Sequence, residues 1–282
     1  MASTFWEQVR ATGLEVPTDR PLDELTTELT IMLGSSDPGR RDDTAYHVLA
    51  TWISRGVYDD LLGGLGDGMT AGLTVGLGES GSDSVFRRSF SALILAECLD
   101  RNNVVDVLPR DTVLVWGDHL SSWFVREKDL RGHVADKGWA HAVAHGADAV
   151  GVLGQVHDFG APELTVLLDV IADRVLAPTD QRLLHGEADR VAAATLAILR
   201  RDIVPLNVLE PWLARIGAAA GAHEDQVPAF NTQAFLRALH LQLAIGRRHP
   251  AVRADLLLTL VDHLRSSNPD YLGQLASPNV TS

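Results

Sequence analysis

A chain of 282 residues with 46% hydrophobic and 22% charged residues has the balance of an ordinary globular protein. The formal net charge is −13, and no basic run exceeds Arg87–Arg88 or Arg247–Arg248, which argues against nucleic acid or an anionic membrane as a partner. No apolar run reaches membrane-spanning length and no signal peptide is visible, so we expect a cytoplasmic protein.

Proline and glycine mark the ends of the predicted helices. Pro21 stands in the first turn of a helix with regularly spaced leucines, and Gly34 closes it. Asp42 or Asp43 is expected to cap a second helix that ends near Gly56. Nine further helices are predicted at 59–76, 83–100, 110–129, 138–156, 161–176, 185–203, 206–219, 228–247 and 250–266.

Taken in pairs, these helices recur roughly every 40–48 residues, which is the period of HEAT and armadillo repeats. The sequence therefore predicts an all-α fold, a HEAT/armadillo-like stack of antiparallel helix pairs. No linker divides the chain, so we expect a single domain over residues 1–282 with a short C-terminal tail at 266–282. A compact helical bundle or an α/α toroid would give a similar pattern of helices.

The segment richest in chemistry runs from Arg131 to Asp148 and reads RGHVADKGWAHAVAHGAD. If a helix begins near Gly138, then His141, His145 and Asp148 fall within about 60° of one another around its axis. Alanine and glycine fill the flanks of that stripe, which lets neighbouring helices approach closely. The stripe is therefore expected to face a cleft.

Two imidazoles and a carboxylate in a partly desolvated cleft can form an acid/base pair or a metal site. We predict His141, His145 and Asp148 as catalytic residues and, in a second version, as the ligands of a divalent metal that activates water for hydrolysis. Ala142 occupies the place of the glutamate in HExxH, so zinc-protease chemistry is not predicted. The alternative is that both histidines are core residues and that Asp148 fixes one imidazole tautomer.

Six further residues are candidates for binding a ligand. Two cations flank the segment, a tryptophan lies within it, an acid opens the helix at 185–203, and a polar stripe follows Pro228. These candidates are Arg131, Lys137, Trp139, Glu187, Arg237 and His240. Surface charge, helix capping and a solvated helix face are the corresponding structural interpretations.

Two other residues are expected to be structural. Arg88 lies between Phe86 and Phe90 and is predicted to be a buried ion-pair partner. Cys98, the single cysteine, lies in an apolar stretch and is predicted to be a core thiol.

Several segments carry a resemblance to a known family. EKDLRG at 127–132 followed by KGWAHAVAHGAD at 137–148 resembles the signature of the bacterial DUF2785 family, which has no assigned function. Looser matches are RDDTAYHVLATWI at 41–53, SVFRRSFSALILAECLDRN at 84–102, GEADRVAAATLAIL at 186–199 and NTQAFLRALHLQL at 231–243. The resemblance implies a mostly helical, HEAT-like protein and brings no catalytic residues with it.

Two functions fit this sequence. The first is a small-molecule enzyme or ligand-binding protein whose pocket is lined by His141, His145 and Asp148. The second is a non-catalytic helical-repeat scaffold that binds a peptide or protein on its concave face. The distinctive KGWAHAVAHGAD segment favours the first.

Overall fold

The structure, a computed structural model, describes residues 4–221 and 226–272. Helices dominate it, and one hairpin of two short strands interrupts them. In chain order the elements are α1 (Phe5–Ala11), α2 (Leu22–Met32), α3 (Pro38–Arg40), the π-helix η1 (Arg41–Tyr46), α4 (His47–Ser54), the 3₁₀ helix η2 (Asp59–Leu61), α5 (Leu62–Gly72), α6 (Ser84–Val105), α7 (Arg110–Arg126), β1 (His133–Val134), β2 (Gly138–Trp139), α8 (Ala142–Leu153), α9 (Ala161–Leu176), α10 (Glu187–Leu199), α11 (Leu206–Ala220), α12 (Gln226–Ile245), α13 (Arg253–Ser267) and α14 (Pro269–Leu272).

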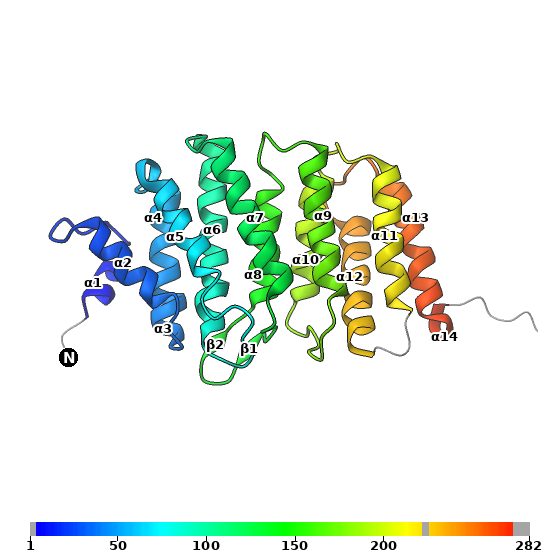
Figure 1. The fold of residues 1–282 in the computed structure, drawn as a ribbon, viewed down its shortest axis with the longest axis horizontal. Helices are drawn as coiled ribbons and strands as arrows, with labels where there is room; N and C mark the ends of the chain where they lie inside the picture. The colour runs from blue at the N-terminus through cyan, green and yellow to red at the C-terminus, as the bar shows by residue number, and fades with distance from the viewer. Residues whose placement is uncertain (1–3, 222–225, 273–282) are drawn as a thin grey trace, which may run out of the picture.

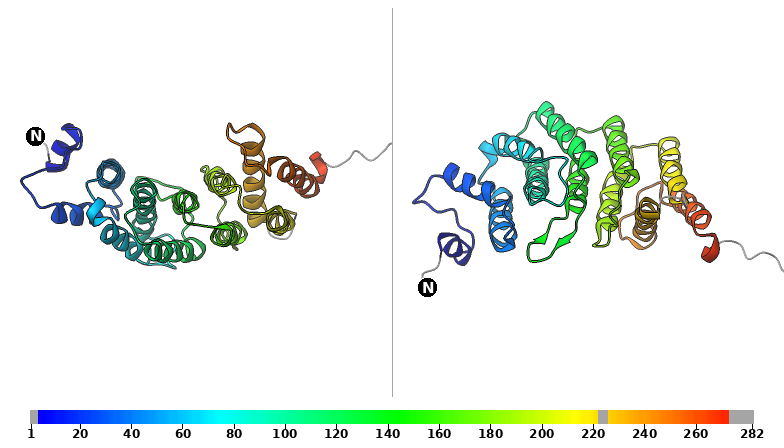
Figure 2. Two further views of the ribbon diagram at one scale, coloured as in Figure 1. Left: turned by 90° about the horizontal axis from the view of Figure 1, so that it is seen from above. Right: turned by 60° about the horizontal axis from the view of Figure 1, so that its bottom comes forward.

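From α4 onward the helices form two rows that run along the long axis of the molecule (Figure 1). One row packs α4, α6, α8, α10 and α12 side by side, and the other packs α5, α7, α9, α11 and α13. From α5 onward each helix also packs against a partner in the opposite row, as α5 does against α6 and α11 against α12. Helices α1 and α14 lie at opposite ends of the long axis, so the rows do not close into a ring (Figures 1 and 2).

Three ion pairs tie neighbouring helix pairs together at one spacing. Each joins an aspartate to an arginine 42 residues later in the chain. The pairs are Asp59–Arg101, Asp148–Arg190 and Asp173–Arg215. In each case the ion pair links one part of the rows to a part that lies about two helices further along the chain.

The ends of most helices follow the predicted punctuation, but three regions differ. The helix expected to begin at Asp42 or Asp43 begins earlier, because the Asp37 side chain accepts a hydrogen bond from the Gly39 amide (2.8 Å) and caps α3. That turn continues through η1 into α4. In addition, the N-terminal helix α1 was not predicted, and a capping box of Thr4 and Glu7 begins it.

In place of the helix predicted at 138–156, the structure has a shorter helix, and a β-hairpin precedes it. Strand β1 pairs antiparallel with β2, His133 opposite Trp139, and the hairpin projects from one edge of the rows (Figure 2). Gly138 has φ +77° and His141 has φ +49°, and neither value fits a right-handed helix. Helix α8 therefore starts only at Ala142.

A buried ion pair anchors the start of the segment that leads to the hairpin. The Glu127 carboxylate accepts hydrogen bonds from Arg88 Nη2, from Trp123 Nε1 and from the Asp129 amide, each at 2.9 Å. Arg88 has no exposed surface, so the prediction of a buried ion-pair partner is confirmed. Cys98 is also fully buried, and burial raises the pKa of its thiol, as expected of a core cysteine.

No helix within residues 4–221 and 226–272 is long and apolar enough to cross a membrane.

Candidate functional site

The hairpin and the first turns of α8 and α10 bring six residues together at one edge of the molecule, at the bottom of Figure 1. Four of them are histidines, and the others are a tryptophan and a glutamate. We call this group the histidine cluster: His133, Trp139, His141, His145, His185 and Glu187.

His141 lies at the centre of the cluster. Its backbone amide donates to the Arg131 carbonyl (3.0 Å), and this bond holds the residue at the base of the hairpin in its left-handed conformation. The Trp139 indole stacks on the imidazole with ring centroids 4.3 Å apart, and Trp139 itself is 43% exposed. The imidazole therefore lies between the hairpin and the start of α10.

Glu187 faces His141 from the first turn of α10. Its side chain is 1% exposed, and its Oε2 accepts a hydrogen bond from the His185 amide (2.7 Å). Its Oε1 lies 3.7 Å from His141 Nε2 and 3.8 Å from His185 Nδ1. Both Oε1 and His141 Nε2 are buried without a hydrogen bond, which is rare for polar atoms in native proteins.

The protonation state of His141 is set by opposing effects. Burial lowers the pKa of its imidazole, and the Glu187 carboxylate opposes that shift. Because burial is the larger effect, the pKa is below its ordinary value and the imidazole is neutral at neutral pH. A neutral imidazole next to a carboxylate can accept a proton from a bound molecule.

His145 is held by a hydrogen-bonded serine. The Ser89 hydroxyl donates to the Ala140 carbonyl, so its oxygen accepts from His145 Nδ1 at 2.7 Å. The proton therefore lies on Nδ1, and Nε2 carries the lone pair. Burial, reinforced by His141 and two arginines, lowers the pKa of His145 to about 3, which keeps this imidazole neutral.

Asp148 does not join the two histidines, which corrects the predicted triad. Its carboxylate forms a two-pronged ion pair with Arg190 of α10, in which Arg190 Nε lies 2.6 Å from Oδ1. His141 and His145 do lie together, with ring centroids 5.8 Å apart. Glu187 takes the place beside His141 that the sequence assigned to Asp148.

The predicted divalent-metal site stays a prediction. Among the residues that the structure describes, no three His, Cys, Asp or Glu side chains are arranged to hold a metal ion. Asp148 is paired with Arg190 here, so the structure offers no ligand set made of His141, His145 and Asp148.

The predicted ligand-binding cations have structural partners instead. Arg131 donates to Asp129 Oδ2 (2.7 Å) and to the Ser82 carbonyl (2.7 Å). Lys137 Nζ lies 2.7 Å from Asp83 Oδ1. Both residues fasten the segment around the hairpin to the loop before α6, and neither contributes its charge to the cluster.

The candidates on α12 also lie away from the cluster. Arg237 donates to Gln233 Oε1 (2.9 Å) and to Asn268 Oδ1 (2.8 Å), so it is engaged at the C-terminal end of the rows. His240 is half-buried on the same helix, and within the described residues no hydrogen bond or ion pair links it to the cluster. Trp139 and Glu187 are the two predicted ligand-binding residues that the structure brings to His141.

Three residues of the site were not predicted. His133 and His185 contact the edges of the Trp139 ring, with centroids 4.9 and 5.6 Å away, and Ser89 bonds His145. Their separation along the chain hides this relationship, because only the hairpin and the loop before α10 bring them together. The quoted segment RGHVADKGW did contain His133, but nothing in its spacing distinguished it.

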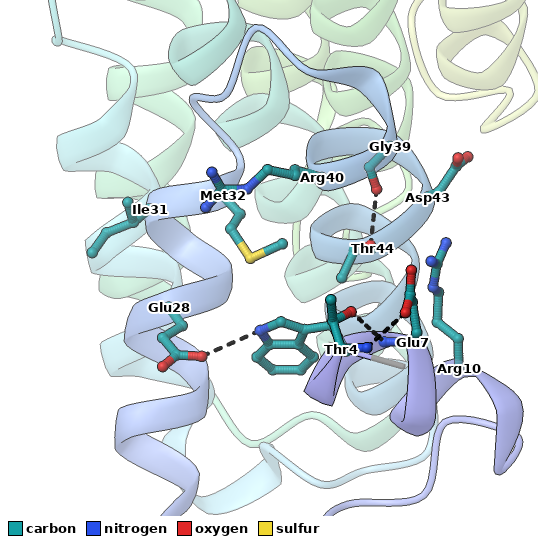
Figure 3. A pocket seen from close by; sticks show the side chains of 11 residues that line it. Thr4, Glu7, Arg10, Glu28, Ile31, Met32, Gly39, Arg40, Asp43 and Thr44 are labelled. Atoms are coloured by element: carbon teal, nitrogen blue, oxygen red, sulfur yellow. Dashed lines mark hydrogen bonds between the residues drawn. The ribbon is translucent and has the colours of Figure 1, made fainter. Parts of the chain in front are cut away.

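Two sizeable cavities lie elsewhere, and neither is lined by the histidine cluster. One, of about 640 Å³, lies between α1, α2 and α3–η1, where the Trp6 indole donates to Glu28 Oε2 (3.2 Å) (Figure 3). The other, of about 800 Å³, lies at the C-terminal ends of α7 and α9. The cleft predicted in front of the histidines is therefore not one of these hollows.

Fold and site together define a mostly helical protein with a histidine-rich edge. The family model of DUF2785, described as a protein of unknown function, matches residues 73–241. This is more than half of the chain, and the chain belongs to that family. No curated protein and no solved structure shows significant similarity to it.

Proposed function

We propose that this protein binds a small polar molecule at the histidine cluster, and that His141 and Glu187 act there as an acid/base pair. One observation carries the proposal: His141 Nε2 and Glu187 Oε1 are buried, lack hydrogen bonds and lie 3.7 Å apart. An unsatisfied buried donor or acceptor costs about 1–3 kcal/mol. Unsatisfied buried atoms of this kind are typical of a site where a bound ligand supplies the missing hydrogen bonds.

The pair has distinct roles in this proposal. Glu187 is fixed by the His185 amide, so its Oε1 is a fixed acceptor for a hydroxyl or amine of the ligand. His141 is neutral because burial lowers its pKa, and it can take up the proton that the ligand releases. Trp139, which is partly exposed, offers an apolar surface beside them.

We also propose that the rows of helices are a HEAT/armadillo-like superhelix in a cytoplasmic protein. The 42-residue spacing of the three inter-pair ion pairs supports the repeat architecture. The same open architecture favours the second candidate function, a scaffold that binds a peptide or protein without chemistry. The two functions differ in whether the histidine cluster is needed for binding.

Retention of small molecules tests the first function. The purified protein is incubated with the small-molecule fraction of a cell extract, separated by ultrafiltration, and the retained compounds are identified by mass spectrometry. We expect a compound retained by the native protein and lost in His141→Ala and in Glu187→Gln. The control His157→Ala, whose side chain is 99% exposed, should retain it. Identical compounds with all four proteins would contradict the proposal and favour the scaffold.

Unfolding provides an independent readout. Glu187→Gln removes a buried charge and supplies an amide that can donate to His141 Nε2, so we expect a gain of about 1 kcal/mol in the free energy of unfolding. If the pair were a structural contact, the same variant would lower that free energy instead.

A further inference from the structure

The cavity of about 800 Å³ is built from the segment that precedes the hairpin, but from residues other than the histidine cluster. The C-terminal ends of α7 and α9, the loop after α5 and the loop before α10 enclose it. Its volume lies in the range of about 300–1,000 Å³ that is typical of small-molecule sites. The lining residues that matter here are Ser80, Arg126, Lys128, Arg174, Thr179 and Gln181.

Arg174 is a buried cation whose hydrogen bonds go to backbone carbonyls. It is 7% exposed, and its Nη1 donates to the carbonyls of Phe124 (3.1 Å) and Glu127 (2.7 Å) at the end of α7. Within the described residues it forms no ion pair, and its hydrogen bonds are made by Nη1 alone. Burial lowers its pKa to about 10, so the guanidinium stays charged at neutral pH.

Helix carbonyls stabilise this charge only in part. The C-terminal end of α7 carries roughly half a negative charge, which favours a nearby cation. The Glu127 carboxylate adds a favourable charge interaction, but it is ion-paired with Arg88, so Arg174 has no counter-charge of its own. The N–H groups that remain free on Arg174, in a residue that lines the cavity, could supply two parallel hydrogen bonds to an oxyanion.

Cations outnumber unpaired acids around the cavity. Arg126 and Lys128 are exposed at its rim, and neither forms an ion pair with any residue the structure describes. Glu127, which also lines the cavity, is bound to Arg88, and this leaves Asp180 as the one other acid in the lining. The chain has a net charge of −13, whereas this cavity, with three cations and one free acid, is locally positive.

We propose that this cavity binds a small organic or inorganic oxyanion, either a phosphate or a carboxylate, with Arg174 as the anchor. Arg126 and Lys128 attract the anion at the rim, and Gln181 and Thr179 border it. Gln181 Oε1 accepts from the Leu130 amide (3.0 Å), so its amide nitrogen is oriented as a donor. The site does not depend on the function proposed for the histidine cluster.

Isothermal titration calorimetry with inorganic phosphate and, separately, with citrate tests this proposal. Sodium chloride at matched ionic strength serves as the blank. We expect the native protein to bind at least one of the two oxyanions, and the identity of that anion separates phosphate from carboxylate ligands. The Arg126→Ala/Lys128→Ala variant alters only exposed side chains and should weaken binding about tenfold, as the loss of a charge-assisted contact predicts.

Three further proteins complete the experiment. Arg174→Gln retains a donor for the α7 carbonyls but removes the charge, and it should abolish measurable binding. Arg247→Ala/Arg248→Ala removes two exposed cations elsewhere and should bind like the native protein. His141→Ala should also bind normally, so failure of the histidine-cluster proposal leaves this one intact. No heat with either anion, or equal affinity in the two double variants, would overturn the proposal.

Discussion

Glu127→Ala is expected to be among the most destabilising single substitutions in this chain. The carboxylate accepts two hydrogen bonds from Arg88, one from the Trp123 indole and one from the Asp129 amide. Its removal leaves the fully buried Arg88 without a counter-charge. Breaking a buried pair in this way costs about 3–5 kcal/mol, of which the stranded charge is the main part.

Urea unfolding followed by far-ultraviolet circular dichroism measures this loss. The control is Arg215→Ala, which breaks the exposed pair with Asp173 and should cost less than about 1 kcal/mol. Arg88→Met/Glu127→Leu removes both charges and should recover much of the stability lost in Glu127→Ala. If Glu127→Ala lost no more stability than Arg215→Ala, the reasoning from a stranded buried charge would be refuted.

Three further outcomes follow from burial and close packing. The pKa of His145 is about 3 when folded and near 6.5 when unfolded, so the unfolded state gains the proton and stability falls as pH drops below about 6.5. At pH 5.5 the loss is about 1.4 kcal/mol, and His145→Asn, which keeps a donor for Ser89, should flatten that part of a stability-versus-pH curve. Gly146→Ala should lower the melting temperature, because the new methyl would lie 2.3 Å from the Phe124 ring, whereas Gly68→Ala meets nothing within 4 Å and should raise it. Cys98 should fail to react with a thiol reagent until the protein is unfolded, and rapid modification of the native protein would show that α6 opens readily.

Local sequence signals were sufficient to predict most of the helices. Proline at a helix start and an apolar spacing of 3.6 residues are local signals, so they do not depend on which other helices pack nearby. The hairpin at 133–139 was missed for the opposite reason. A distant part of the chain stabilises it, since Arg41 Nη2 donates to the Lys137 carbonyl (2.8 Å), which lies 96 residues later in the sequence.

The candidate site was predicted in part. The helical spacing correctly brought His141 and His145 together, although His141 precedes the helix and does not belong to it. The same spacing placed Asp148 with them, but a helical wheel contains no information about Arg190, which lies on the next helix of the row. Glu187 was predicted as a ligand-binding candidate, but its place beside His141 depends on how α8 and α10 pack.

In the open, two-row arrangement, an inner helix pair packs against the pairs before and after it. The stability of one pair therefore depends mainly on its immediate neighbours. The histidine cluster and the oxyanion cavity draw residues from more than one helix pair. Substitutions near either end of the rows are therefore expected to leave both sites intact, whereas changes between residues 77 and 190 alter the packing that forms them.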